Sequence, residues 1–323
     1  MVDVIRAGRR SAVLTPSGLP CLSTIPTINL TSGCLHDCAY CYIHGYSTYP
    51  GEGRVILYEN TLEKLQHELV RRRAKPRAVY FSPSSDLFQP APEVLDLARA
   101  VLDLLFRKEI GVAFLTKGCI PDEILRLLVE HAELVRAQVG IITLDDAISQ
   151  AFEPNAACPE RRLTQMQALI AAGVPTEARL DPILPGLTDD PQSVKRLFAA
   201  LTRIGVRRAA ASVLFLRPAI VQSLRRNVPD KEMLARLLSA YQGSERIGLR
   251  GTGSHVQTLP SAVRRELFAQ MREIASAHSI ELSVCACKNP DLASGSCNIA
   301  GRWPKQEAWS VQPVLAGEFA GRH

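Results

Sequence analysis

The sequence predicts an α/β fold, a partial (β/α)6 barrel with a C-terminal extension. Strand-like and helix-like segments alternate six times between residues 25 and 220. Short connections join these segments, and glycine or polar residues follow the strands. This alternation implies a parallel sheet with right-handed crossovers. Because α/β barrels keep their chemistry at the carboxyl ends of the strands, we expect the functional residues there.

Short apolar or β-branched runs that end in turn residues indicate the strands. The predicted strands are residues 25–30, 77–82, 112–116, 134–142, 176–184 and 206–216. Between them, apolar side chains recur at helical spacing. The predicted helices are residues 61–73, 93–107, 124–131, 161–172 and 191–203. Pro92 before one helix and Gly173 after another are typical of helix boundaries.

Other patterns flank the barrel, which we assign to residues 25–220. Residues 1–24 contain Pro16 and Pro20 and show little periodicity, which predicts an irregular N-terminal arm that wraps the barrel. Residues 221–323 form a predicted C-terminal extension. It should contain, in order, a helix at residues 231–241, a helix at 261–278, a strand at 280–284 and a loosely ordered tail.

The composition is that of an ordinary globular protein. The 323 residues are 46% hydrophobic and 22% charged. No apolar run approaches the roughly 18 residues of a membrane span, and the N-terminus lacks the apolar core of a signal peptide. We therefore expect no membrane partner and a cytoplasmic location. The net charge of +6 at pH 7 permits nucleic-acid binding without requiring it.

Three cysteines follow the first predicted strand. Cys34, Cys38 and Cys41 have a Cys-x3-Cys-x2-Cys spacing. Three soft thiolates this close suit an iron–sulfur cluster or a zinc ion. Zinc would need a fourth ligand, which His36 or His44 could supply, but zinc ribbons favour paired Cys-x2-Cys knuckles. The spacing therefore favours a cluster, and a [4Fe–4S] cluster on three cysteines keeps one iron free.

The segment from Gly33 to Tyr42 resembles the radical S-adenosylmethionine (SAM) superfamily, in particular the branch of spore photoproduct lyase and the DNA repair photolyase-like proteins. The resemblance extends over about residues 25 to 220 and includes the segment Asp181-Pro-Ile-Leu-Pro-Gly186. It implies reductive cleavage of SAM at a [4Fe–4S] cluster, which forms a 5′-deoxyadenosyl radical that abstracts a hydrogen atom from a substrate. It also implies an electron donor such as flavodoxin or ferredoxin.

The same resemblance implies SAM-binding residues at other strand ends. Ser85 and Asp86 would accept hydrogen bonds from the SAM amino group, although helix capping is an alternative role. Lys117 would pair with the SAM carboxylate, the alternative being a solvated strand end. Thr143 and Arg179 would face the ribose and carboxylate, and for these two a structural role is an equal alternative.

Tyr40 and Tyr42 flank Cys41, and the lyase resemblance implies that they are catalytic hydrogen-atom relays. Packing beside a cluster is the alternative role. The lyase places a hydrogen-donating cysteine where this chain has Pro83. We therefore do not expect repair of a thymine photoproduct by the same donor scheme. Cys119 is a candidate substitute donor.

Two ion pairs are expected near these residues. Glu153 with Arg161 or Arg162 would hold the loop after the fourth strand over the site. Asp181 lies in an otherwise apolar strand and therefore needs a partner. Arg179, two residues earlier, lies on the same strand face and is the candidate.

A second cysteine group follows the last predicted strand. Cys285, Cys287 and Cys297 are spaced as ligands, and we predict an auxiliary iron–sulfur cluster. Its fourth position would be open or filled by Cys21, Asn298 or another group. Zinc and free thiols are the alternatives. A lone free thiol remains the ordinary interpretation of Cys21, as it is of Cys119 and Cys158.

Three functions compete. The branch resemblance and the positive charge slightly favour a radical SAM enzyme that acts on a nucleic-acid lesion or modified nucleotide. The second cysteine group and Pro83 favour a biosynthetic radical SAM enzyme that acts on a peptide or small metabolite. A zinc-bound nucleic-acid-binding module is the alternative outside this class.

Overall fold

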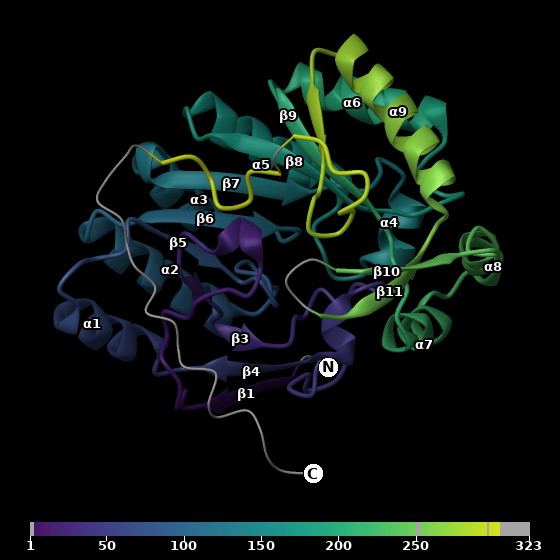
Figure 1. Cartoon of the computed structure of the whole chain (residues 1–323). Coiled ribbons are helices and arrows are strands. Elements are labelled where there is room, and N and C mark those ends of the chain that lie inside the picture. The colour runs from purple at the N-terminus through teal and green to yellow at the C-terminus, as the bar shows by residue number, and fades with distance from the viewer. Residues whose placement is uncertain (1–2, 250–252, 296, 304–323) are drawn as a thin grey trace.

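The computed structural model describes residues 3–249, 253–295 and 297–303. A seven-stranded sheet with helices on one face forms its centre (Figure 1). The strand order is β12-β9-β8-β7-β6-β5-β2, and each neighbouring pair is parallel. The strands are β2 (Thr27–Ile28), β5 (Ala78–Phe81), β6 (Gly111–Thr116), β7 (Val135–Gly140), β8 (Thr176–Ile183), β9 (Arg208–Val213) and β12 (Glu281–Val284). The predicted α/β fold with a parallel sheet is confirmed.

Amphipathic helices connect these strands and cover the outer face of the sheet (Figure 1). They are α1 (Thr61–Arg71), α2 (Pro92–Arg107), α3 (Asp122–Glu130), α4 (Asp146–Phe152), α5 (Pro159–Ala171), α6 (Pro191–Arg203) and α9 (Ser261–Ala277). Large apolar side chains fill the space between the helices and the sheet, as where Phe114 of β6 packs edge-on against Phe88. Among the described residues, no helix combines the length and the apolar character needed to cross a membrane.

The inner face of the sheet packs against the N-terminal arm. Ala78, Tyr80 and Ala113 alternate with the outward core residues and pack against Leu22 and Ile25 of the N-terminal arm. The arm therefore covers part of the inner face through a 3-10 turn, η1 (Pro20–Leu22). Because side chains alternate along a strand, the outer face builds the core and the inner face remains for a cavity.

The prediction of an irregular arm is wrong for its first residues. A three-stranded sheet contains β1 (Asp3–Ala7), β4 (Arg54–Tyr58) and β3 (Thr31–Ser32). Strand β1 pairs with β4 in parallel, from Asp3 opposite Arg54 to Ala7 opposite Tyr58. Most residues of β1 are exposed, so it has no alternation to reveal a strand, and its partner lies about fifty residues along the chain.

The C-terminal region continues the central sheet, because β12 pairs with β9 in register from Glu281 opposite Arg208. Before it come α7 (Pro218–Asn227), α8 (Lys231–Ser239) and the hairpin of β10 (Glu245–Gly248) and β11 (His255–Thr258). Two further 3-10 turns are η2 (Tyr42–Gly45) and η3 (Ala132–Leu134). Helices α4 and α7 were not predicted. Residues 304–323 of the predicted tail lie outside the described residues.

The backbone after β6 packs too closely for a side chain at Gly118. A Cβ atom there would lie 2.0 Å from the Phe88 carbonyl oxygen. We predict that Gly118→Ala lowers the free energy of unfolding by about 1–3 kcal/mol, because the two backbone segments must separate. The control Gly8→Ala, whose Cβ would be 3.5 Å from the Asn60 side chain, should change it by less than about 0.5 kcal/mol. Equal urea-unfolding curves for the two variants would contradict this prediction.

Candidate functional site

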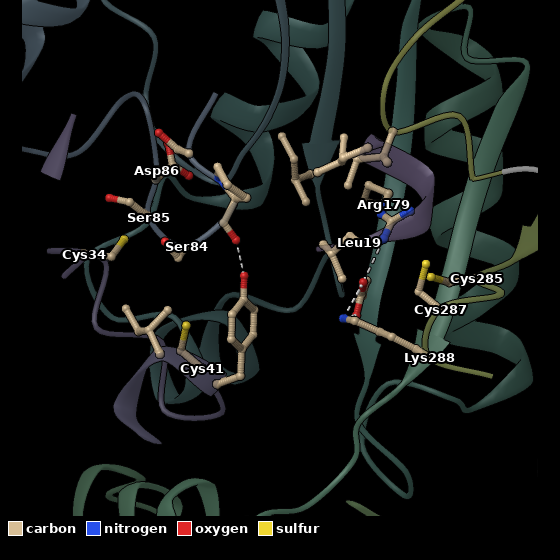
Figure 2. Close-up of a pocket in the computed structure, with 18 of the residues that line it drawn as sticks. Leu19, Cys34, Cys41, Ser84, Ser85, Asp86, Arg179, Cys285, Cys287 and Lys288 are labelled. Carbon is tan, nitrogen blue, oxygen red and sulfur yellow. Dashed lines mark hydrogen bonds and ion pairs between the residues drawn. The ribbon is translucent and has the colours of Figure 1, made fainter. Parts of the chain in front are cut away.

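The three cysteines of the first group line one cavity of about 580 Å³ at the carboxyl ends of the strands. Figure 2 shows Cys34 and Cys41 at this cavity. Gly33 begins the loop with φ of +86°, and a Cβ there would lie 2.8 Å from the Arg54 carbonyl oxygen. Burial raises the pKa of Cys34, Cys38 and Cys41. Because bound metal stabilises thiolates, the unfavourable burial of these thiolates would be offset in a metal centre.

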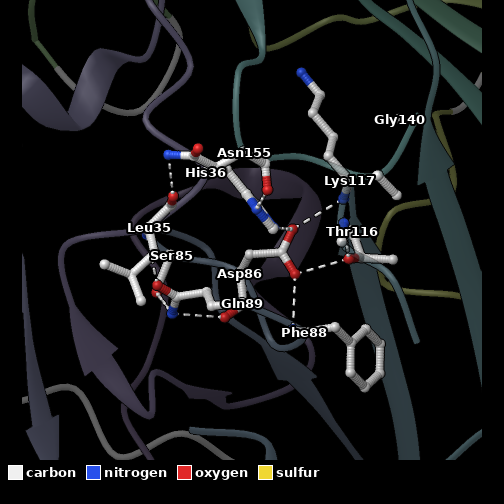
Figure 3. Close-up of polar contacts among 12 residues, drawn as sticks. Leu35, His36, Ser85, Asp86, Phe88, Gln89, Thr116, Lys117, Gly140 and Asn155 are labelled. Carbon is white, nitrogen blue, oxygen red and sulfur yellow. Dashed lines mark hydrogen bonds and ion pairs between the residues drawn. The ribbon is translucent and has the colours of Figure 1, made fainter. Parts of the chain in front are cut away.

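His36 anchors this loop and is not free to bind zinc. Its Nδ1 lies 3.1 Å from the Asn155 carbonyl oxygen, and its Nε2 lies 3.3 Å from Oδ2 of Asp86. Asn155 also donates to the Leu35 carbonyl oxygen at 3.0 Å (Figure 3). His44, the other histidine considered as a zinc ligand, is not among the residues that line the cavity.

Asp86 joins three segments at the floor of the cavity. Its Oδ1 accepts from the Thr116 hydroxyl at 2.7 Å and from the Phe88 N–H at 2.9 Å, and its Oδ2 accepts from the Lys117 N–H at 2.9 Å (Figure 3). Burial opposes the charge, but His36 and these hydrogen bonds outweigh it, so the pKa of Asp86 is lowered. A carboxylate with this many partners holds the cysteine loop against the ends of β5 and β6.

Ser85 also contacts the cysteine loop. Its hydroxyl donates to the Gly33 carbonyl oxygen at 2.8 Å and lies 2.5 Å from the Thr31 hydroxyl. The Gln89 amide donates to both hydroxyls, at 3.0 and 2.8 Å. Ser85 and Asp86 line the cavity as predicted, but their side chains already bind protein groups. Their predicted role toward SAM remains a prediction.

Lys117 lies over the end of β7 in a buried network. Its ammonium is 3.0 Å from Oε1 of Glu153 and donates to the Tyr40 hydroxyl at 2.5 Å. The Tyr40 hydroxyl itself donates to Glu153. Gly140 makes room for this side chain, since a Cβ there would lie 2.7 Å from Cε of Lys117 (Figure 3). With 15% of its side chain exposed, Lys117 still lines the cavity.

Glu153, at the C-terminal end of α4, binds Arg162 rather than Arg161. Its Oε2 lies 2.5 Å from Nη2 of Arg162, and both side chains are buried. Arg161 instead pairs with Asp122 on the surface, at 3.1 Å. Burial by itself would raise the pKa of Glu153, but Lys117 and Arg162 outweigh it and lower the pKa to about 2. The loop after β7 is therefore held by a buried charge cluster.

Asp181 is the centre of a second charged network. The expected pair with Arg179 forms, with Nη2 of Arg179 2.9 Å from Oδ2 of Asp181. Lys288, which was not predicted, lies 2.7 and 2.8 Å from the two carboxylate oxygens. Lys117 donates to the Asp181 carbonyl oxygen at 3.2 Å. This network connects the two sides of the cavity.

The second cysteine group lines the same cavity as the first. Figure 2 shows Cys285 and Cys287 beside Arg179 and Lys288, across the cavity from Cys34. The group contains a fourth thiol, because Cys287 Sγ lies 3.4 Å from Cys21 Sγ. Of the two interpretations of Cys21, the structure therefore supports its place beside the second group and not that of a lone thiol, although its partner lies over 260 residues away in the sequence.

Asn298, the other named candidate for the fourth position, binds elsewhere. Its side-chain amide donates to Glu177 at 2.9 Å. Among residues 3–249, 253–295 and 297–303, no group of three or more His, Cys, Asp or Glu side chains is arranged to hold a single metal ion.

Two predicted residues are not brought to the cavity. Cys119 is exposed and its thiol accepts a hydrogen bond from Nε of Arg161 at 3.3 Å. The Thr143 hydroxyl accepts from the Asp145 N–H at 3.0 Å, next to α4. Neither is among the residues that line the cavity. Tyr42 does line it, and its hydroxyl donates to the Pro83 carbonyl oxygen.

Comparison with known proteins identifies the family that the region of the first cysteine group matches. Residues 28–198 match the family model of the radical SAM superfamily. The chain is 28% identical over 200 residues to an uncharacterized protein of Mycobacterium tuberculosis, and the match covers 59% of each chain. It therefore spans 59% of the length of this relative. It is 24% identical over 204 residues to an uncharacterized protein of Acidianus two-tailed virus, with 59% of this chain and 67% of the relative covered.

Solved structures share the fold. Spore photoproduct lyase complexed with dinucleoside spore photoproduct has a TM-score of 0.64 and 17% sequence identity, over 87% of this chain and 81% of that chain. A mutant of the lyase with bound AdoMet and the same dinucleoside has the same values. At this identity the likeness shows the fold alone.

The charge cluster at Glu153 gives a stability prediction. Glu153→Gln leaves Lys117 and Arg162 buried without an anion, and should lower the free energy of unfolding by about 3–5 kcal/mol at neutral pH. A carboxylate with a depressed pKa stabilises the fold above its unfolded-state pKa. The difference from the wild type should therefore persist above about pH 4.5 and diminish as the pH falls towards about 2.

Chemical denaturation between pH 3 and pH 8 measures this difference. The control is Asp122→Asn, which removes the exposed partner of Arg161. It should lower the free energy of unfolding by at most about 1 kcal/mol. Similar losses in the two variants at neutral pH would contradict a buried role for Glu153.

Proposed function

Because the chain belongs to the radical SAM superfamily of enzymes, we propose that Cys34, Cys38 and Cys41 hold a [4Fe–4S] cluster and that SAM binds beside it. The family match over residues 28–198 carries this proposal. The donor set supports it, since three thiols from one loop line a single cavity. When bound, cluster and SAM supply a 5′-deoxyadenosyl radical that abstracts a hydrogen atom from the substrate. This family assignment favours an enzyme over the alternative function, a zinc-bound nucleic-acid-binding module.

The chain's own residues position these groups. His36 and Asp86 hold the cysteine loop in place. Lys117 carries a charge next to the cavity, and we propose that it binds the SAM carboxylate while Glu153 keeps it oriented. We propose that Ser85 and Asp86 accept hydrogen bonds from the SAM amino group. The lining of the cavity around these groups is largely apolar, which would limit water near a radical once SAM and substrate fill the cavity.

Tyr42 is our candidate for handling the hydrogen atom. It lines the cavity beside Cys41, and its hydroxyl reaches the Pro83 carbonyl oxygen, where the lyase resemblance places a donor cysteine. Tyr40 binds Glu153 and Lys117, which favours a positioning role. The electron would come from a flavodoxin or ferredoxin, and we place the reaction in the cytoplasm.

We propose a nucleic-acid lesion or modified nucleotide as the substrate. The net charge of +6 and the fold shared with a lyase complexed with dinucleoside spore photoproduct support this class. A specific observation favours the alternative, a peptide or small metabolite. The second cysteine group lines the same cavity, so an auxiliary iron–sulfur cluster there would lie within the substrate chamber.

SAM cleavage tests the activity. After anaerobic reconstitution, wild-type protein with dithionite should release methionine and 5′-deoxyadenosine. Cys38→Ala should reduce this product at least a hundredfold, because the cluster loses one of three ligands. The control is Cys158→Ala, which removes an exposed thiol outside the cavity and should cleave SAM as the wild type does. A wild-type protein that carries a cluster but never cleaves SAM would rule out the proposed function.

Substrate class is tested by stimulation of this cleavage. A nucleic-acid substrate predicts that ultraviolet-irradiated DNA accelerates 5′-deoxyadenosine release, that undamaged DNA does not, and that DNA binding weakens steeply with salt. High-performance liquid chromatography of the nucleoside measures the rate. Acceleration by a peptide or metabolite fraction, with none by irradiated or modified oligonucleotides, would instead establish the biosynthetic alternative.

A further inference from the structure

Four thiols meet on the side of the cavity opposite the first cysteine loop. Cys287 donates to Cys21 at 3.4 Å. Cys285 and Cys297 are buried in one packed cluster, against which Cys21 and Cys287 also pack. The four thiols therefore lie together in one group. They pack around Ala210 and Ile299 on the inner face of the sheet.

We infer that Cys21, Cys285, Cys287 and Cys297 form a closed, four-cysteine iron–sulfur site, in which Cys21 supplies the fourth ligand and leaves no iron open to substrate. The inference deepens the auxiliary iron–sulfur cluster predicted from the sequence and rests on that prediction for the kind of metal centre. It does not depend on SAM cleavage.

The backbone holds the segments in place independently of the thiols. The Cys285 N–H donates to the Ala211 carbonyl oxygen of β9 at 3.1 Å. Val284 and Ser294 pair across the base of the intervening loop. The Gln138 amide of β7 donates to the Cys297 carbonyl oxygen at 2.7 Å. A site assembled in this way needs little reorganisation to bind metal.

The fourth cysteine comes from the N-terminal arm. Cys21 is the middle residue of η1, and its neighbour Leu22 is buried against Tyr80 and Ala113 of the sheet. The arm thus delivers a thiol to the group from a segment that precedes the barrel. The 3.4 Å contact joins two thiols, both of which would lose their protons and move apart on binding a cluster.

Arg179 provides an independent sign of an anionic occupant. Its side chain is 4% exposed, and only Nη2 binds a protein group, Asp181. Its Nε and Nη1 are buried without a hydrogen-bond partner among the described residues. Unpaired buried donors are costly. They lie beside Cys285 (Figure 2), where thiolate or sulfide sulfur would accept from them.

The environment favours a cluster over zinc. The thiols are not arranged around a single metal ion, whereas a four-iron cluster needs a larger space, which the adjoining cavity offers. Hydrogen bonds and nearby positive charge stabilise reduced iron–sulfur clusters. Arg179 and Lys288 supply both on one side. A closed cluster exchanges no ligand, so its chemistry would be outer-sphere: it would take one electron from a reduced ferredoxin- or flavodoxin-class donor and pass that electron to the proposed cluster on Cys34, Cys38 and Cys41 across the same cavity.

The full-length triple variant Cys34→Ala, Cys38→Ala, Cys41→Ala isolates this site. After anaerobic reconstitution it should retain about four irons per chain, with no addition of SAM. Adding Cys21→Ala should leave a cluster with three cysteine ligands. On mild ferricyanide oxidation that cluster should lose one iron and show the electron paramagnetic resonance signal of [3Fe–4S]. The matched control, Cys158→Ala in the same triple variant, should remain a four-iron cluster.

Three outcomes of this experiment would overturn the inference. An unchanged four-iron spectrum after Cys21→Ala would show that Cys21 is not a ligand. A colourless protein with one zinc, or a metal-free protein with a Cys21–Cys287 disulfide, would exclude the cluster. If the triple variant does not fold, the wild type should bind about eight irons and, on the same oxidation, show about one [3Fe–4S] signal per chain from the three-cysteine first cluster; Cys21→Ala in that background should raise this to about two per chain. A wild-type protein that binds this second cluster but does not cleave SAM would contradict only the proposed function.

A second measurement addresses Arg179. In the triple variant, Arg179→Met should make the reduction potential of the cluster more negative, because two hydrogen-bond donors and a positive charge are lost. The control is Arg196→Met on α6, whose side chain binds Ser193 on the surface. An unchanged reduction potential in Arg179→Met would show that Arg179 is not a positioning residue for the cluster.

Discussion

Compensation of buried charge is the constraint on which the site depends. Three carboxylates lie in or beside the cavity with almost no exposure: Asp86, Glu153 and Asp181. Each would be very unfavourable there without partners. Each is therefore bound by cations or backbone N–H groups from other segments. The contacts that stabilise these charges also fix the positions of the loops. The loops are therefore held in place by the same ion pairs and hydrogen bonds that allow the carboxylates to be buried.

Lys117 shows how this arrangement prepares a binding residue. A lysine at a free strand end would be mobile and hydrated, and ordering it would cost conformational entropy on binding. Here Glu153 and Tyr40 hold its ammonium, and the missing side chain at Gly140 gives it a path over the sheet. The Lys117 side chain is partly exposed and lines the cavity. The proposed carboxylate of SAM would therefore meet an already oriented charge.

The cavity is bounded by two cysteine groups from opposite ends of the chain. Parallel strands bring their carboxyl ends to one edge, so β2 and β12 deliver both loops to the same side although they are the outermost strands of the sheet. Asp181 connects the two sides, through Lys117 to the first group and through Arg179 and Lys288 to the second.

The sequence by itself determined the α/β class, the parallel sheet and the first cysteine loop, because these depend on short-range periodicity and spacing. It also placed Ser85, Asp86 and Lys117 at strand ends and Arg179 on the fifth predicted strand. Only the tertiary structure decided what their side chains bind and which residues lie together. Cys21 joins Cys287, and β1 pairs with β4, through contacts between segments far apart in sequence. Such pairings leave no local pattern, since the energy that selects them arises only when the sheet brings the segments together.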